Sequence, residues 1–183
     1  MQEPAQIGQR VRLRAVAEDD LARVRAWLDD PGIRDQLTIP FLEQDLREAD
    51  WVAALCQDRG AVHFAIVLCQ DERHIGNCGL HGIDAGRHEA QFGILIGDRT
   101  LWGKGYGTEA ARLTLAYGFG ELHLGRICLR VAVRNERAQR VYEKAGFLPE
   151  DSQGLPRTSS QEGRTLGMVL DAARWQRLLR ACF

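Results

Sequence analysis

The chain lacks the features that mark several large protein classes. Its five cysteines are odd in number and scattered, with no C-x-x-C pair, so the sequence indicates neither a disulfide framework nor a zinc ribbon. The five histidines show no metal-ligand spacing, no apolar run approaches the roughly 18 residues of a membrane span, and the first residues lack a signal-peptide pattern. A net charge of −1 provides no basic surface for nucleic acid. We therefore expect a cytoplasmic protein without a metal, a nucleic-acid partner or a membrane contact.

What the sequence does contain is typical of one globular domain. Its 183 residues are 45% hydrophobic and 27% charged, which suffices for a sizeable core. Alternating or apolar runs predict strands at 11–14, 62–68, 74–83, 89–96, 126–133, 147–148 and 166–170. Helical spacing predicts helices at 21–28, 43–56, 108–119, 135–145 and 171–178, with 32–41 irregular and 152–164 a loop. Short turns join the three middle strands into a predicted antiparallel meander.

A glycine-rich segment between a strand and a helix is the most informative motif. Gly103, Gly105 and Gly107 fall within five positions, after the strand at 89–96. Helix N-termini present unpaired N–H groups and a partial positive charge, and glycines let a ligand approach the backbone, so the segment predicts a phosphate site. Its G-x-G-x-G pattern, with Lys104 inside, matches neither the dinucleotide fingerprint nor the P-loop. Taken alone, a tight turn without a ligand is the commoner explanation.

The helix after this segment makes the two strands that flank it parallel. A crossover between the runs at 89–96 and 126–133 requires both strands to run in the same direction. The glycine-rich segment then lies at the carboxyl end of the first strand, which is where open α/β sheets bind ligands. Position and composition therefore agree on an anion site.

Two segments together resemble one enzyme family. Residues 102–110 and 135–147 are similar to the paired motifs of the GCN5-related N-acetyltransferase (GNAT) superfamily, and within it to the branch of ribosomal-protein N-terminal and spermidine acetyltransferases. The resemblance covers nearly the whole chain and implies a single acetyltransferase domain over residues 1–183. It implies an α/β (α+β) fold with a mixed, mostly antiparallel sheet of about seven strands, helices on both faces, and a central parallel strand pair splayed to hold acetyl-CoA.

The resemblance assigns the contacts to acetyl-CoA. The family motif [Q/R]-x-x-G-x-[G/A] falls on Trp102, Gly105 and Gly107, with Trp in place of Gln or Arg, and its backbone amides hold the pyrophosphate. Pantetheine pairs with the preceding strand like an added strand, and Asn135 contacts pantetheine while also capping its helix. Lys104 either adds charge or is a solvated loop residue. The implied contacts are Phe92, Gly93, Ile94, Leu95, Ile96, Trp102, Gly103, Lys104, Gly105, Tyr106, Gly107, Thr108, Asn135 and Tyr142.

The resemblance also implies direct transfer of the acetyl group to an amine. A neutral amine attacks the thioester carbonyl, and a strand amide near Ile94 or Leu95 meets the oxyanion. Tyr142 protonates the leaving thiolate as the general acid. A tyrosine that only fills the core is the alternative explanation for this position.

The catalytic base is the least determined part of the site. In the related branch a Glu on this strand serves as base or substrate anchor, and here Gln91 stands in its place. Glu89 lies on the same strand face as Gln91, and His81 lies at the end of the preceding strand, so Glu89, His81 and water are the candidate bases. Gln91 and His81 are also expected to contact the substrate. A solvated surface role is the alternative for Glu89 and for His81.

The expected acceptor is a primary amine, on either a small molecule or a protein N-terminus. Asp19, Asp20, Asp29 and Asp30 either attract a cationic amine or form a solvated helix face, which is the commoner case. A non-catalytic acyl-CoA-binding protein with the same fold is the alternative function, which the missing Glu keeps open. The family is compatible with a homodimer, on which composition carries no information.

Overall fold

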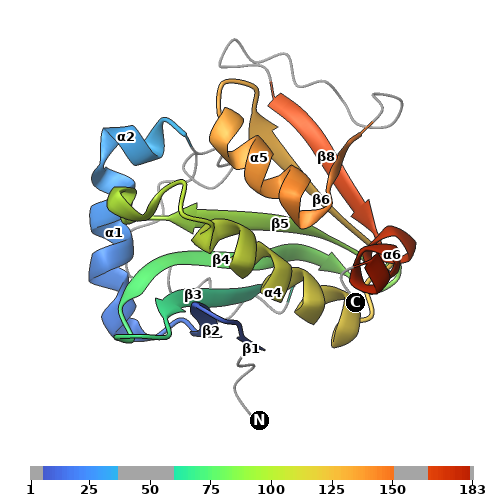
Figure 1. Cartoon of the computed structure of the whole chain (residues 1–183), viewed down its shortest axis with the longest axis horizontal. Helices are drawn as coiled ribbons and strands as arrows, with labels where there is room; N and C mark the ends of the chain where they lie inside the picture. The colour runs from blue at the N-terminus through green and yellow to red at the C-terminus, as the bar shows by residue number, and fades with distance from the viewer. Residues whose placement is uncertain (1–5, 37–59, 151–164, 182–183) are drawn as a thin grey trace.

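A computed structural model describes residues 6–36, 60–150 and 165–181, which form one sheet with helices packed around it (Figure 1). The predicted helix at 43–56 and the loop at 152–164 lie outside the described residues. In chain order the elements are β1 (Gln6–Ile7), β2 (Val11–Ala15), η1 (Glu18–Asp20), α1 (Leu21–Asp29), α2 (Pro31–Arg34), β3 (Val62–Leu68), β4 (His74–Asp84), β5 (Glu89–Ile96), η3 (Arg99–Leu101), α4 (Tyr106–Gly120), β6 (Arg126–Ala132), α5 (Glu136–Ala145), β7 (Leu148–Pro149), β8 (Thr165–Asp171) and α6 (Ala172–Ala181).

The sheet has eight strands in the order β1-β2-β3-β4-β5-β6-β8-β7. Neighbouring strands are antiparallel except β5 and β6, which are parallel and joined through α4. The mixed, mostly antiparallel fold and the β3-β4-β5 meander are therefore confirmed. The sheet has one strand more than predicted because β1 pairs only Gln6 and Ile7 with β2, a stretch too short to show a period in the sequence.

The central parallel pair is splayed, as predicted. β5 pairs with β6 at only three positions, from Glu89 opposite Arg126 to Gln91 opposite Cys128. Further on, β5 keeps its partner β4 as far as Ile96, and β6 keeps β8 along its whole length. Figure 1 shows the two strands diverging near α5. The second half of β5 therefore has an open edge. We call the space between this edge and β6 the strand gap.

The helix α4 packs closely on one face of the sheet. Its residues Ala110, Ala111 and Leu115 are fully buried. A Cβ atom at Gly118 would lie 2.9 Å from side-chain carbons of Leu80 on β4 and Ile127 on β6. Gly118 and the two alanines are small and let the helix lie close to the sheet on both sides of β5, which positions the glycine-rich segment at the N-terminus of α4.

The helices differ from the prediction in two places. α4 begins two residues earlier than predicted, because Gly105 with a φ of 89° starts the helix without a capping side chain. A short helix, α2, stands where an irregular stretch is predicted, since the Asp30 side chain accepts a hydrogen bond from the Gly32 N–H and Pro31 suits a first helical position. Among the described residues, no helix is both long and apolar enough to cross a membrane.

Asp20 is buried, which corrects the expectation of a solvated acidic face before α1. Its carboxylate accepts hydrogen bonds from Arg14 Nη1 and Nη2 at 2.6 and 2.7 Å and from the Ala17 N–H at 2.8 Å. Burial alone would raise the pKa of Asp20, but these hydrogen bonds produce a net lowering. The helical pattern of the sequence does not reveal that Arg14, on β2, pairs with Asp20. Asp20 is therefore a structural ion-pair residue and is not available to attract an amine.

We expect Asp20→Ala to lower the free energy of unfolding by about 2–4 kcal/mol, because the substitution removes a buried carboxylate that pairs with Arg14 and lies 3.1 Å from His74 Nδ1. The carboxylate stabilises the fold above the unfolded pKa of Asp, and this contribution is lost as the pH falls through the lower folded pKa. Urea unfolding at neutral and acidic pH measures both effects. The control Glu136→Ala removes only the exposed pair with Arg140 and should cost less than about 0.5 kcal/mol. An Asp20→Ala protein as stable as the wild type would contradict this account.

Candidate active site

The open edge of β5 directs backbone groups into the strand gap. The carbonyl of His88, just before β5, accepts hydrogen bonds from the N–H groups of Gly125 and Arg126 on the β6 side, at 2.7 and 3.1 Å. Backbone groups alternate in direction along a strand, so the N–H and C=O of Ile94 point to the same side. Pairing with β6 has already ended there. Of the two predicted oxyanion donors, Ile94 therefore has the suitable direction and Leu95 does not.

Trp102 closes the far end of this edge. Its indole N–H donates to the Ile96 carbonyl at 2.7 Å, so that carbonyl, one of the groups expected to pair with pantetheine, already has a partner. The guanidinium carbon of Arg137 lies 3.3 Å from the centre of the indole ring, and that of Arg99 lies 5.4 Å from it. Trp102 stands where the family motif has Gln or Arg, and it links β5 to α5 across the end of the strand gap.

The glycine-rich segment forms the start of α4. Gly103 and Gly105 have φ values of 75° and 89°, a conformation that side chains rarely adopt. Within the described structure no side chain caps this helix, so its first N–H groups, which include those of Gly107 and Thr108, lack a side-chain acceptor. Lys104 is exposed beside them. The residues expected to hold the pyrophosphate thus form a helix N-terminus with amides available to an anion.

An ion pair between Arg10 and Glu109, which the sequence does not reveal, holds the glycine-rich segment in place. Arg10 donates from Nε to Glu109 Oε2 at 2.9 Å and from its backbone N–H to Glu109 Oε1 at 2.7 Å. Its Nη1 also donates to the Lys104 carbonyl at 2.9 Å. Burial acts to raise the pKa of Glu109, but the hydrogen bonds from Arg10 give a net lowering. In the sequence, Glu109 is only an acid in the first turn of a helix, and Arg10 is 99 residues away.

Asn135 begins α5 and is buried. Its Oδ1 accepts from the Ala138 N–H at 3.1 Å, which confirms the predicted N-cap. Its Nδ2 donates to the Gln36 carbonyl at 2.9 Å, so the side chain also ties α5 to the residues after α2. Gly146 ends the helix with a φ of 112°, as predicted for a C-terminal glycine. The contact of Asn135 with pantetheine stays a prediction.

Tyr142 faces the sheet from α5. Its ring lies edge-on to Phe92 of β5 and to Phe147, with centroids 6.1 and 6.0 Å apart, and the residue is 6% exposed. Within the described part of the chain, its hydroxyl has no hydrogen-bond partner. Burial raises the pKa of Tyr142 to about 12. The side chain therefore stays protonated at neutral pH and is able to donate its proton.

His81 lies on the opposite face of β5. A Cβ atom at Gly93 would lie 3.2 Å from His81 Cε1, so the imidazole occupies the space that a side chain at position 93 would fill. Gln91 pairs with His81 in the sheet register and is exposed. Strand alternation places Gln91 and Gly93 on one face and Phe92, with Tyr142, on the other. The backbone next to Ile94 is thus flanked by an imidazole and a phenol.

Glu89 lies at the start of β5, away from this position. It is four residues before Gly93, or about 13 Å along a strand. Its Oε1 lies 4.0 Å from Arg126 Nη1, and Arg126 also pairs with Glu150. Of the two predicted protein bases, only His81 lies against the second half of β5, at Gly93.

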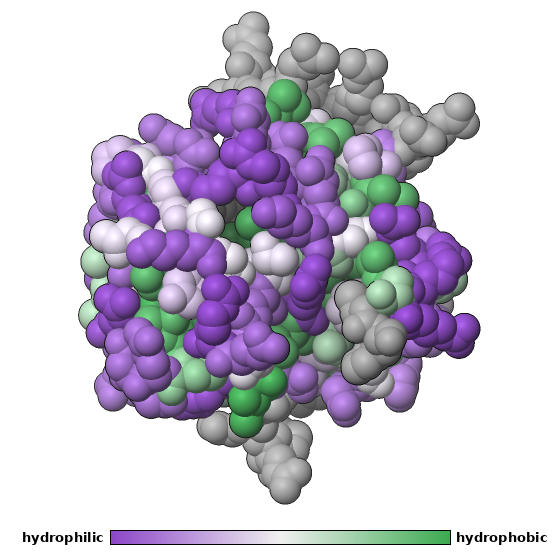
Figure 2. Space-filling model, in the orientation of Figure 1, coloured by the Kyte–Doolittle hydropathy of each residue, from purple (hydrophilic) through white to green (hydrophobic). Residues whose placement is uncertain are grey.

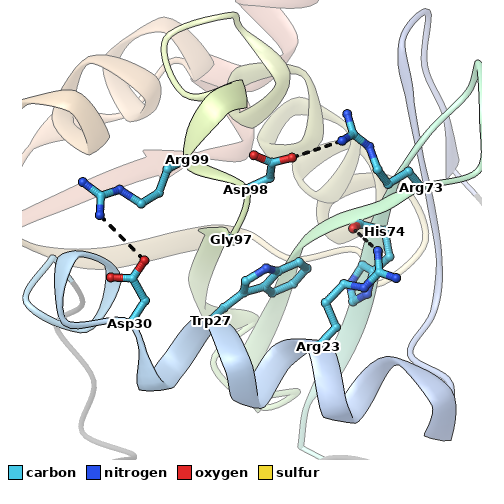
Figure 3. A pocket seen from close by; sticks show the side chains of 8 residues that line it. All are labelled: Arg23, Trp27, Asp30, Arg73, His74, Gly97, Asp98 and Arg99. Atoms are coloured by element: carbon cyan, nitrogen blue, oxygen red, sulfur yellow. Dashed lines mark hydrogen bonds and ion pairs between the residues drawn. The ribbon is translucent and has the colours of Figure 1, made fainter.

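A polar pocket lies beyond the end of β5, on the side of α1 (Figure 3). Its charges are largely paired: Arg73 Nη1 lies 3.3 Å from Asp98 Oδ2, and Arg99 Nη1 lies 3.7 Å from Asp30 Oδ2. The pocket holds about 320 Å³ and is lined by Arg23, Trp27, Asp30, Arg73, His74, Gly97, Asp98 and Arg99. It lies past Ile96, outside the strand gap, and we assign it no part in the chemistry.

The strand gap has the character of a ligand site. Figure 2 shows a hollow between α5 and the start of α4, with apolar residues inside it and polar residues around it. Among the described residues, no cluster of three or more His, Cys, Asp or Glu side chains is placed to hold a metal ion. The groups assembled here suit an extended ligand with amides and phosphates, which pairs along β5 and ends at the start of α4.

Comparisons with known proteins agree with this geometry. The "Acetyltransferase (GNAT) domain" family matches residues 10–148. The "Uncharacterized N-acetyltransferase p20" of Bacillus licheniformis is 29% identical over 78% of this chain and 81% of its own. The spermidine N(1)-acetyltransferase of Escherichia coli K12 is 30% identical over a stretch that covers 76% of this chain and 74% of the relative. The spermidine N-acetyltransferase of Vibrio cholerae, solved with CoA and spermine, superposes with a TM-score of 0.76 at 23% identity and covers 91% of this chain and 98% of its own.

These similarities account for the splayed strands, the glycine-rich helix start and the motif of α5 together. A family match over residues 10–148 includes both sides of the strand gap. The chain belongs to the GNAT family of acetyltransferases, and its reaction is the transfer of an acetyl group from acetyl-CoA to an amine.

Proposed function

We propose that the acceptor is the primary amine of a small molecule and that transfer takes place in the strand gap beside Ile94. The observation that carries the proposal is the placement of this open backbone between Tyr142 on one face and His81 on the other. The similarity to spermidine acetyltransferases supports a small amine as the acceptor. The alternative role as a non-catalytic acyl-CoA-binding protein has no counterpart among these named acetyltransferases.

Each group has one task in the proposed reaction. The neutral amine nitrogen attacks the thioester carbon, and the Ile94 N–H donates to the oxyanion that forms. The C–S bond then breaks, its electron pair goes to sulfur, and the Tyr142 hydroxyl gives its proton to the thiolate. His81, directly or through one water, takes the proton that the amine loses. Gln91 hydrogen-bonds the acceptor and does not act as a base, because its amide cannot take a proton at neutral pH.

The base is tested by two single variants. We expect His81→Gln to lower kcat/KM about 10- to 100-fold at neutral pH, with the affinity for acetyl-CoA unchanged, because a proton acceptor is lost next to Gly93. Glu89→Gln should lower it less than about threefold, since Glu89 is remote and pairs with Arg126. Thiol release at fixed amine concentration measures both rates. The opposite order of effects would make Glu89 the base and contradict the role of His81.

The acceptor is tested by following thiol release from acetyl-CoA with a panel of amines. The panel includes spermidine and other polyamines, amino sugars, amino acids, and peptides with free N-termini. We expect small amines to support turnover and peptides to support little. Turnover confined to peptides would make a protein N-terminus the acceptor, and tight acetyl-CoA binding without thiol release from any amine would favour the non-catalytic role. A homodimer and a cytoplasmic location stay predictions from the sequence.

A further inference from the structure

The guanidinium of Arg137 is held in an unusual setting at the end of the strand gap. Arg137 lies in the first turn of α5, and its guanidinium carbon is 3.3 Å from the centre of the Trp102 ring. Cation–π stacking of this kind places the charge but uses none of the five N–H donors of the group. The donors of Arg137 are therefore left to make hydrogen bonds elsewhere.

Within the described part of the chain, nothing neutralises this cation. Among the described residues, no carboxylate lies within ion-pair distance of Arg137, and none makes a hydrogen bond with its side chain. The side chain is half-buried, and Arg99 brings a second positive charge to the same indole ring. Burial first, and then the charge of Arg99, lower the pKa of Arg137. A half-buried guanidinium without an anion is unfavourable, so a ligand with negative charge would stabilise this arrangement.

The fold brings Arg137 close to the start of α4. Trp102, on which it stacks, directly precedes Gly103. One turn further along α5, Val141 lies on the same helix face, and a Cβ atom at Gly107 would be 3.8 Å from Val141 Cγ2. The face of α5 that carries Arg137 therefore packs against the first turn of α4, where the amides suited to a phosphate lie.

We propose that Arg137 binds the diphosphate of the coenzyme, from the α5 side, opposite the backbone amides at the start of α4. Trp102 takes the place of the polar residue in the family motif, and the stacked Arg137 supplies the charge that this position then lacks. Trp102 also donates to the Ile96 carbonyl of β5. The pair of Trp102 and Arg137 therefore connects the bound diphosphate to both β5 and α5. The proposal rests on the coenzyme site described above.

The test compares two acetyl donors that differ in their phosphates. Acetyl-CoA carries the diphosphate, and acetyl-pantetheine has the same thioester and arm without any phosphate. We expect Arg137→Gln to lower kcat/KM for acetyl-CoA about 10- to 100-fold, the loss of one charge-assisted hydrogen-bonded contact, and to leave that for acetyl-pantetheine within a factor of about 2. Arg137→Lys should recover part of the loss. The control Arg140→Gln, on the exposed side of the same helix, should change neither.

Three outcomes would overturn the proposal. An equal loss with both donors would show that Arg137 only supports the fold of α5. An unchanged value for acetyl-CoA would show that the diphosphate does not use Arg137. A loss of affinity for CoA that disappears with 3′-dephospho-CoA, measured by calorimetry, would assign the contact to the 3′-phosphate instead. A separate outcome concerns the proposed function: a wild-type chain that turns over neither donor would refute the transfer site.

Discussion

Tyr142→Phe is expected to lower kcat about 100-fold or more while leaving the affinity for acetyl-CoA within a factor of about 2. The substitution removes one oxygen and keeps the ring that packs against Phe92 and Phe147, so the fold and the gap are preserved. The lost hydroxyl is the group proposed to protonate the leaving thiolate. Because the pKa of Tyr142 is raised to about 12, the wild type should lose no activity through this tyrosine below about pH 11.

The matched control is Tyr117→Phe. Tyr117 lies on α4 with its ring edge-on to Phe64, away from the strand gap, and burial raises its pKa as well. Its replacement should leave kcat unchanged. Presteady-state and steady-state thiol release measure the effect on the chemical step, and calorimetry with CoA measures affinity. A kcat of Tyr142→Phe equal to that of the wild type would leave Tyr142 as a core residue only.

Gly105→Ala is expected to weaken acetyl-CoA binding more than about 100-fold, because two or more charge-assisted contacts to the diphosphate are lost. Gly105 starts α4 with a φ of 89°, which costs a side chain about 1–2 kcal/mol. The new Cβ would also lie 3.0 Å from Arg10 Nη2 and disturb the hold of Arg10 on the Lys104 carbonyl. The backbone at residue 105 then leaves its positive-φ conformation, and the first N–H groups of α4 lose the direction that the diphosphate requires.

Gly107→Ala provides the comparison within the same segment. Gly107 is inside α4, where alanine is favoured, and its Cβ would make ordinary contacts at 3.6 Å with Ile96 and 3.8 Å with Val141. We expect its coenzyme affinity to stay within about fivefold of the wild type. Calorimetric titration with CoA, with thermal unfolding to verify the fold, separates the two variants. Equal affinities for the two alanine variants would show that the positive φ at Gly105 is not needed for coenzyme binding.

The sequence was sufficient for the features that depend on local conformation. Three glycines after an apolar strand, a crossover helix and an asparagine at a helix start are patterns visible in the sequence, and the structure contains the glycine-rich helix start, the parallel strand pair and the Asn135 cap that they predict. The splay of the strand pair was implied by the family resemblance. The strand positions followed from alternation for the same reason. The two-residue strand β1 and the helix α2 were missed, because neither is long enough to show a period.

Contacts between distant residues account for most of what could not be predicted. Arg10 and Glu109 are 99 residues apart, and their pairing depends on β2 lying beside α4. The acidic run before α1 predicts a solvated face, yet Asp20 is buried by its pairing with Arg14. The proposal of His81 over Glu89 as the base also needed the structure, since the sheet register pairs His81 with Gln91 and the imidazole lies against Gly93.

A crystal structure of the full chain with a non-hydrolysable ketone analogue of acetyl-CoA tests the site most directly. We expect the arm in the strand gap, the ketone oxygen accepting from the Ile94 N–H, the sulfur within hydrogen-bond reach of the Tyr142 hydroxyl, and the diphosphate at the start of α4. His81 should lie on the side from which an amine approaches the carbonyl. An arm bound outside the gap, or a sulfur turned away from Tyr142, would contradict this expectation.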